Sequence, residues 1–193
     1  MAISYQVGEK EFLTLKMSPF FLFIHSVIGI LLGFAVFFLF LAIKNTTLFS
    51  LSAYAPALTG LIVSNFWIWK IFFKFKNTIL VLTSRRVVRV EKSILGSNKV
   101  RSLFWKEIGK VKTLNSFFIS RFINIGTLVF VPSSAILGDI TFSYVPNFDK
   151  VSNFIDEILY LAVVQELNEE ELIKEVQAKR QSNPFLLLSD PKF

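Results

Sequence analysis

The feature that most constrains this chain is an apolar run from Phe20 to Ile43, which contains no charged side chain and is bounded by Pro19 and Lys44. As a helix rising about 1.5 Å per residue, such a run is roughly 36 Å long, enough to cross a hydrocarbon core of about 30 Å. It lacks the polar stripe of a soluble helix, and it is longer than the apolar centre of a signal peptide. The run therefore predicts a transmembrane helix that is retained as an anchor.

A second and less apolar segment follows closely, from Leu51 to Trp69 and on to about residue 73. Its hydroxyl groups can bond to carbonyls of their own helix, and Pro56 falls in its first turns, so both are compatible with a membrane span. The connection from Asn45 to Ser50 is short. It favours an antiparallel helical hairpin over residues 19–76, the alternative being a re-entrant or interfacial segment.

Small side chains recur at helical spacing in both predicted spans. Such residues let helix backbones approach closely within a membrane. They predict that the two helices pack on each other, the alternative being that each packs on another subunit. The predicted packing residues are Gly29, Gly33, Ala53, Ala57, Gly60 and Ser64.

Lysines flank the predicted hairpin unevenly. The connection between the spans has Lys44, whereas Lys10 and Lys16 precede the first span and three lysines follow the second between residues 70 and 76. Positively charged flanks stay on the cytoplasmic side of a membrane. Both ends of the chain are therefore expected in the cytoplasm.

The composition argues against catalysis. The chain has no cysteine and one histidine, His25, which lies inside the first predicted span. A thiolate metal site, a disulfide framework and a Ser–His pair outside the membrane are therefore excluded. A structural hydrogen bond explains a lone imidazole near the end of a span better than proton chemistry does. We expect no enzyme activity, no metal and no cofactor.

Charge divides the remainder of the chain in two. Between Lys70 and Arg121 the only acids are Glu91 and Glu107, whereas acids predominate from Asp139 onward. A basic segment beside a bilayer is attracted to anionic lipid, although the same residues can be ordinary solvated strand faces. Nucleic acid is not expected, because no recognised binding motif accompanies the charge. The candidate lipid-facing or anion-facing residues are Lys74, Lys76, Arg85, Arg86, Arg89, Lys92 and Lys99.

Short β-rich runs follow the hairpin. Turn-forming residues such as Thr83–Ser84 and Asn115–Ser116 separate them. Several short strands at this spacing predict a small antiparallel barrel or sandwich. The expected strands are 77–82, 85–91, 100–105, 109–114, 125–131 and 140–144.

The apolar period becomes helical after Pro146. A helix is expected from Phe148 to Leu167, and a capping box at Asn168 and Glu171 predicts a second, acidic helix that ends at about Gln181. The tail after it carries an apolar patch that either packs on a neighbour or is disordered. The residues expected to contact a partner are Leu172, Ile173, Val176, Phe185, Leu186 and Leu187.

Several short motifs carry a resemblance to a known family. Leu82-Thr83-Ser84-Arg85-Arg86 stands where that family has a Leu-Thr-x-x-Arg step, and Asn124-Ile125-Gly126-Thr127 stands where it has Gly-x-Gly-Thr, with Asn124 in place of the first glycine. With Gly96 and the spaced aliphatics Leu103, Ile108 and Val111, the segment from Asn77 to about Ala162 resembles bacterial pleckstrin-homology (PH) domain membrane proteins. The resemblance implies a short membrane hairpin before a strongly bent seven-strand sheet capped by a C-terminal helix. It implies binding or assembly rather than catalysis, and no ligand site is transferred.

The predicted fold class is a membrane α-helical hairpin plus an α+β PH-like domain. Four parts are expected: a cytoplasmic segment at 1–18, the hairpin at 19–76, the PH-like domain with its capping helix at 77–167, and an acidic helix with an apolar tail at 168–193. The opposite charges of the soluble parts can pair head to tail between neighbouring copies.

The expected function is that of a scaffold or interaction module at the cytoplasmic face of a bacterial inner membrane. Its partners are the bilayer and either a second copy or another membrane protein, and no small-molecule substrate is expected. The alternative is a non-catalytic subunit of a transporter or channel. Its pathway would use the polar residues of the spans, namely His25, Ser26, Ser64 and Asn65.

Overall fold

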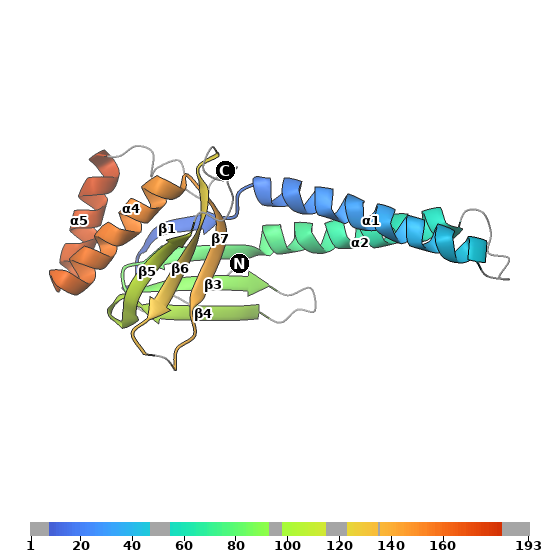
Figure 1. Cartoon of the computed structure of the whole chain (residues 1–193). Coiled ribbons are helices and arrows are strands. Elements are labelled where there is room, and N and C mark those ends of the chain that lie inside the picture. Colours follow the sequence, from blue (N-terminus) through green and yellow to red (C-terminus); the bar gives the residue numbers. More distant parts are fainter. Residues whose placement is uncertain (1–7, 47–54, 93–97, 115–122, 135, 183–193) are drawn as a thin grey trace. The chain divides into compact units, whose positions relative to one another are not determined.

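The computed structural model describes residues 8–46, 55–92, 98–114, 123–134 and 136–182 of the chain (Figure 1). The chain divides into two compact units. One, called here the helical unit, is Pro19–Asn77. The other, called here the β-unit, joins Met1–Ser18 to Thr78–Phe193. The layout is α+β, with two apolar helices, two antiparallel sheets and helices near the C-terminus.

The helical unit contains α1 (Phe20–Thr46) and α2 (Ala55–Asn77). Both helices are long and apolar enough to cross a membrane. Large apolar side chains on them point outward: Leu31 is 61% exposed and Ile62 is 64% exposed. Because exposing such side chains to water is unfavourable, the two candidate spans indicate a membrane protein. α2 begins later than expected, at Ala55, and continues beyond residue 73 to Asn77.

The first sheet of the β-unit has the strand order β1-β2-β3-β4 and is antiparallel throughout. Its strands are β1 (Glu11–Lys16), β2 (Thr78–Thr83), β3 (Arg86–Lys92) and β4 (Asn98–Phe104). Strand β1 was not predicted, because residues 1–18 were expected to be separate from the strand domain. Figure 1 shows β1 lying beside β2 although the whole hairpin separates them in the sequence.

The second sheet has the order β5-β6-β7 and is also antiparallel. Its strands are β5 (Ile108–Leu114), β6 (Ile125–Pro132) and β7 (Ile140–Pro146), and the short helix η1 (Trp105–Glu107) joins it to β4. The expected strand positions agree with the described strands to within a few residues, because alternation and turn residues mark them. Fully buried side chains from both sheets, including Leu80, Phe130 and Phe142, form the core.

Backbone hydrogen bonds hold the chain where it leaves β1 and where it leaves β4. Ser18 N, just after β1, donates to Tyr144 O in β7 at 2.8 Å, and Trp105 N, just after β4, donates to Arg85 O at 3.1 Å. The Trp105 indole is buried and donates to Thr83 O at 2.9 Å. The end of the N-terminal segment is therefore bound to both sheets.

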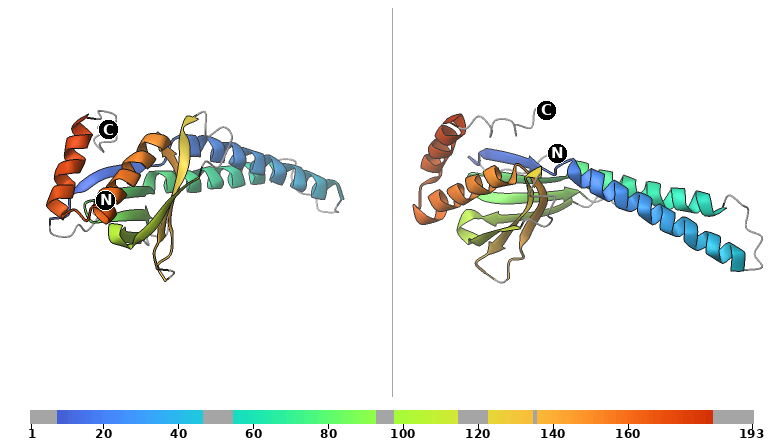
Figure 2. Two further views of the ribbon diagram at one scale, coloured as in Figure 1. Left: turned by 60° about the vertical axis from the view of Figure 1, so that its left-hand side comes forward. Right: turned by 45° about the horizontal axis from the view of Figure 1, so that its top comes forward.

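The C-terminal part contains α4 (Phe148–Leu159), the π-helical turn η2 (Tyr160–Val164) and α5 (Glu169–Ser182). The helix expected from Phe148 to Leu167 is therefore shorter and ends in a π-helical turn. Asn168 N donates to the Glu171 side chain at 3.2 Å, which is one half of the expected capping box. Figure 2 shows α5 beside α4 from two further directions.

Candidate functional site

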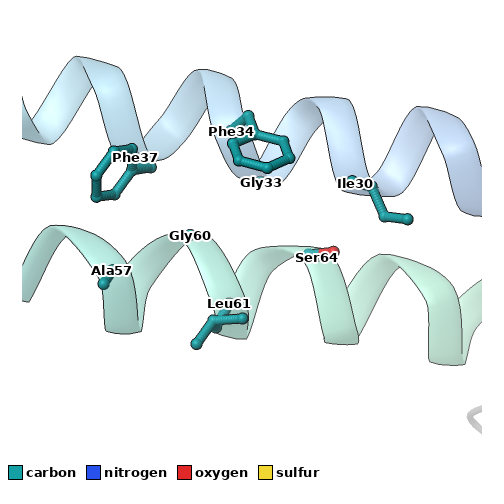
Figure 3. Close-up of a pocket in the computed structure, with 8 residues that line it drawn as sticks. All are labelled: Ile30, Gly33, Phe34, Phe37, Ala57, Gly60, Leu61 and Ser64. Carbon is teal, nitrogen blue, oxygen red and sulfur yellow. The ribbon is translucent and has the colours of Figure 1, made fainter.

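The two helices of the helical unit approach most closely at glycines. A Cβ atom on Gly33 would lie 2.9 Å from Gly60 O and 2.9 Å from the Ser64 Cβ, and one on Gly60 would lie 2.8 Å from Gly33 O. A Cβ on Gly29 would lie 2.7 Å from the Trp67 ring. Only glycine permits this backbone separation at Gly33 and Gly60, where the obstacle is itself backbone. Figure 3 shows Gly33 facing Gly60 across the pair.

An apolar groove of about 320 Å³ lies along this contact, between residues of α1 and α2 (Figure 3). Ser64 supplies its hydroxyl, and the remaining lining is apolar. Of the predicted packing residues, Gly33, Ala57, Gly60 and Ser64 line this groove, and Ala53 lies outside the described residues. The groove contains no group suited to catalysis.

Polar side chains of the helical unit bond to their own helices. His25 Nδ1 lies 2.9 Å from Phe21 O, Asn65 Nδ2 donates to Leu61 O at 2.9 Å, and Thr59 Oγ1 donates to Ala55 O at 2.9 Å. Such bonds satisfy polar groups inside an apolar environment. The channel alternative therefore gains no support from His25 or Asn65.

Strand register defines two ends of the first sheet. At one end Lys16 lies opposite Ile79, Thr78 opposite Glu91 and Lys92 opposite Asn98. The chain passes to α1 and returns from α2 at this end, which we call the root end. At the other, distal end Glu11 lies opposite Thr83 and Arg86 opposite Phe104. Because strands rise about 3.3 Å per residue, five steps along β2 separate the ends by about 17 Å.

A buried ion pair holds the N-terminal segment at the distal end. The Glu9 side chain is 0% exposed and accepts two hydrogen bonds from Arg86, each of 2.9 Å. Thr83 Oγ1 donates to the same carboxylate at 2.7 Å. The paired geometry compensates for the burial of both charges. Glu9 was not singled out from the sequence, because its partners lie 74 and 77 residues away.

A second carboxylate holds α5 at the same end. Glu169 accepts hydrogen bonds of 2.7 Å from Arg85 and from the Ser84 hydroxyl. The hydrogen bond from Arg85 lowers the pKa of Glu169, and the hydrogen bond from Ser84 acts in the same direction. The hydrogen bond to Glu169 raises the pKa of Arg85. We call Glu169, Arg85 and Ser84 the α5 clamp.

The third arginine of this region is also bonded within the chain. Arg89 donates to Thr141 O at 2.6 Å and to Glu91 at 2.8 Å. Arg85, Arg86 and Arg89 were candidate anion-facing residues, and the structure gives each of them an internal acidic partner. Arg85 and Arg86 also lie at the distal end of the sheet, away from the root end. These two features disfavour a role in contacting lipid.

The candidate lysines have a different environment. Lys92 and Lys99 are exposed at the root end, as is Lys16, which was not among the candidates. Lys74 and Lys76 are exposed in the last turn of α2. The sequence could have indicated Lys16 as well, because it lies four residues before the first apolar run.

The apolar face of α5 is covered by the chain itself. Leu172, Ile173 and Val176 are buried, at 3%, 7% and 2% exposure, and Lys179 pairs with Glu157 of α4. These three side chains were expected to contact a partner, but in this structure other parts of the chain cover them. Phe185, Leu186 and Leu187 lie outside the described residues.

Within the described ranges, no cluster of three or more His, Asp or Glu side chains could hold a metal ion. Comparisons of the chain with protein-family models, curated proteins and solved structures found no match. The arrangement of basic, acidic and apolar surfaces is therefore the basis for a functional proposal.

Proposed function

We propose that this protein is a membrane-anchored interaction module, in which the hairpin holds the β-unit at the cytoplasmic face of a bacterial inner membrane. The observation that carries the proposal is the pairing of β1 with β2 on either side of the hairpin. The module acts through protein assembly and has no catalytic role.

Strand pairing constrains the membrane topology. Lys16 and Ile79 are directly opposed, so the segments before α1 and after α2 belong to one sheet. If both helices cross the membrane, both segments must lie on the same side. The lysines that flank these segments favour the cytoplasmic side.

The strand order supports a PH-like fold for the β-unit. Seven strands in sheets of four and three precede a helix, as the family resemblance implies. Asn124, which replaces a glycine of the family pattern, has a φ of 52°. Glycine and asparagine both tolerate this left-handed conformation, so the substitution is compatible with the loop. The resemblance began at Asn77, whereas the unit also includes β1.

Exposed charges of opposite sign support self-association as the mode of assembly. Glu170 and Glu175 of α5 are exposed, as are Lys110 and Lys112 of β5. Neighbouring copies would pair these surfaces head to tail, which forms a ring if the rotation closes. Glu169 has no part in this contact because it belongs to the α5 clamp.

Single cysteines test the anchor, because the natural chain has none. In spheroplasts, an impermeant maleimide should label Ser50→Cys directly, and it should label Lys10→Cys and Gln177→Cys only after permeabilisation. Labelling of Lys10→Cys and Gln177→Cys from opposite sides would refute the topology.

Charge exchange tests the assembly. Cross-linking in native membranes should trap multimers of the natural chain and fewer of the Glu170→Lys/Glu175→Lys variant. Adding Lys110→Glu/Lys112→Glu should restore the multimers, because the two surfaces then have exchanged charges and still attract each other. A natural chain that yields monomers alone in membranes and in mild detergent would contradict self-association.

A further inference from the structure

Three exposed lysines gather at the root end of the first sheet. Lys16 ends β1, Lys92 ends β3 and Lys99 lies near the start of β4. They are far apart in the sequence, and the register alone brings them to one end. We call Lys16, Lys92 and Lys99 the root lysines.

The covalent connections keep these lysines near the start and end of the hairpin. Lys16 precedes the first residue of α1 by four positions, and Thr78 directly follows the last residue of α2. Thr78, Glu91 and Lys99 lie opposite one another on three successive strands. At about 4.8 Å between strands, the Lys99 backbone is about 10 Å from Thr78. That separation is close to the Debye length at physiological ionic strength, about 8 Å.

The charges of the root lysines are available to a partner. No acid pairs with any of them in the described part of the chain, and Glu91, which lies opposite Lys99, bonds to Arg89 instead. The arginines of the same sheet differ, since Arg85, Arg86 and Arg89 each have an internal carboxylate. The internal ion pairs therefore leave a positive surface at the root end.

We propose that the root lysines form a docking surface for the anionic headgroups of the bilayer that holds the hairpin. The inference rests on the proposed function, because it requires the helices to span a membrane. The root lysines are positively charged and an inner leaflet is negatively charged. The short connections to α1 and α2 keep the two within about a Debye length of each other. Lipid charge thereby sets how closely the β-unit rests on the membrane.

The expected effect follows from the attraction of one basic residue to an anionic leaflet. Each lysine contributes about fivefold to the equilibrium between the docked and undocked unit, and three together contribute about a hundredfold. Exposed lysines elsewhere on the unit serve as a control of equal charge. Lys10, Lys106 and Lys174 are exposed, and their segments are bonded to the Ser84–Arg85 turn at the distal end through Lys10 O, Trp105 N and Glu169.

The test uses the full chain in nanodiscs that hold one copy, made of phosphatidylcholine with or without phosphatidylglycerol. A dye on Asn98→Cys, which is exposed at the root end, reports contact through quenching by headgroup-labelled lipid. Quenching should be stronger with phosphatidylglycerol and should fall at high salt. The Lys16→Gln/Lys92→Gln/Lys99→Gln variant should lose this difference, and the Lys10→Gln/Lys106→Gln/Lys174→Gln variant should keep it.

Equal quenching of the natural chain in both kinds of disc would overturn the inference without reference to any variant. So would an equal loss in the two triple variants. Failure of the natural chain to remain in the discs would instead refute the membrane anchor, so the two failures are distinguishable. Circular dichroism of each variant separates loss of contact from loss of fold.

Discussion

At the scale of the residue, this protein uses charge mainly for internal cohesion. Glu9 forms an ion pair with Arg86, and Glu169 forms one with the adjacent Arg85. These two ion pairs hold the N-terminal segment and α5 at the same end of one sheet. Their environments differ: Glu9 is 0% exposed, whereas Glu169 is 29% exposed. The two carboxylates should therefore differ in their contribution to stability.

Replacing Glu9 with glutamine should destabilise the β-unit by about 3 kcal/mol, because it removes the buried carboxylate charge that accepts two hydrogen bonds from Arg86. Glu170→Gln removes an exposed acid and should change the free energy of unfolding by less than about 0.5 kcal/mol. Chemical denaturation of the full chain in detergent compares the two. Equal stabilities would show that the Glu9 contact contributes little.

Two glycines make a matched test of packing. A Cβ on Gly126 would overlap the buried Phe148 ring, whereas a Cβ on Gly138 would meet nothing within 4 Å. Gly126→Ala should lower stability by about 1–3 kcal/mol, because the ring must move in a packed core. Gly138→Ala should be neutral or slightly stabilising. Thermal unfolding of both variants measures the difference, and a neutral Gly126→Ala would contradict the contact.

At the scale of the element, α5 is held by an apolar face and by charged contacts at two places. Leu172, Ile173 and Val176 are buried, Glu169 bonds to Arg85 near the start of the helix, and Lys179 pairs with Glu157 further along. Apolar burial does not depend on pH, but the charged contacts do. The docking of α5 should therefore weaken in acid rather than disappear.

Glu169 determines the direction of that pH dependence. Its pKa is lowered from the ordinary value of 4.5, chiefly by the bond from Arg85, while nearby Glu9 acts in the opposite direction. Because the pKa of Glu169 is lowered in the folded protein, its ion pair contributes fully to α5 docking above pH 4.5. This contribution is lost as the pH falls through the lowered pKa of Glu169. A spin label on Gln177→Cys should become more mobile below that pH.

The Glu169→Gln variant supplies the control for this experiment. Its label should already be more mobile at neutral pH, and its mobility should change less on acidification, because the charge is absent throughout. If the natural chain and the variant have the same pH profile, the α5 clamp is not the titrating contact.

At the scale of the whole molecule, a hairpin of two long apolar helices interrupts a folded unit between its first two strands. Lys16 and Ile79 are partners across β1 and β2, so the two points where the chain leaves and returns are neighbours. This geometry resembles a β-hairpin whose loop has become two helices. The N-terminal segment cannot complete the sheet until the chain after α2 has been made.

Replacing residues 19–77 with a short glycine-containing turn should therefore yield a folded, water-soluble β-unit. A chain of residues 78–193 should fold poorly, because without β1 it lacks Phe12, Leu13 and Leu15, which are buried. Circular dichroism, size-exclusion chromatography and amide exchange would compare the two. Equal folding of both proteins would show that β1 is dispensable.

Local patterns were sufficient to predict much of the fold. The run from Phe20 to Ile43 predicted α1 because a long uncharged segment has few alternatives to a membrane helix. Alternation and turns placed six strands, and helical periodicity with a capping residue placed α5. These signals act over a few residues, so they can be recognised without knowledge of the partner segments.

Strand β1 could not be recognised in the same way. Its six residues carry weak alternation just before a membrane segment, and its partner begins more than sixty residues later. The candidate site was missed in part for the same reason, because the acids that bind Arg85 and Arg86 lie 84 and 77 positions away in the sequence.

Two apolar helices, a set of short strands, helices near the C-terminus and an uneven distribution of charge could all be inferred from the sequence alone. Each follows from periodicity or composition within a short window. The three-dimensional structure was needed to show that β1 pairs with β2 around the hairpin. It was also needed to show which basic residues form internal ion pairs. The β1–β2 pairs and the ion pairs of Arg85 and Arg86 join residues about 60 to 85 positions apart, and no local propensity selects among such partners.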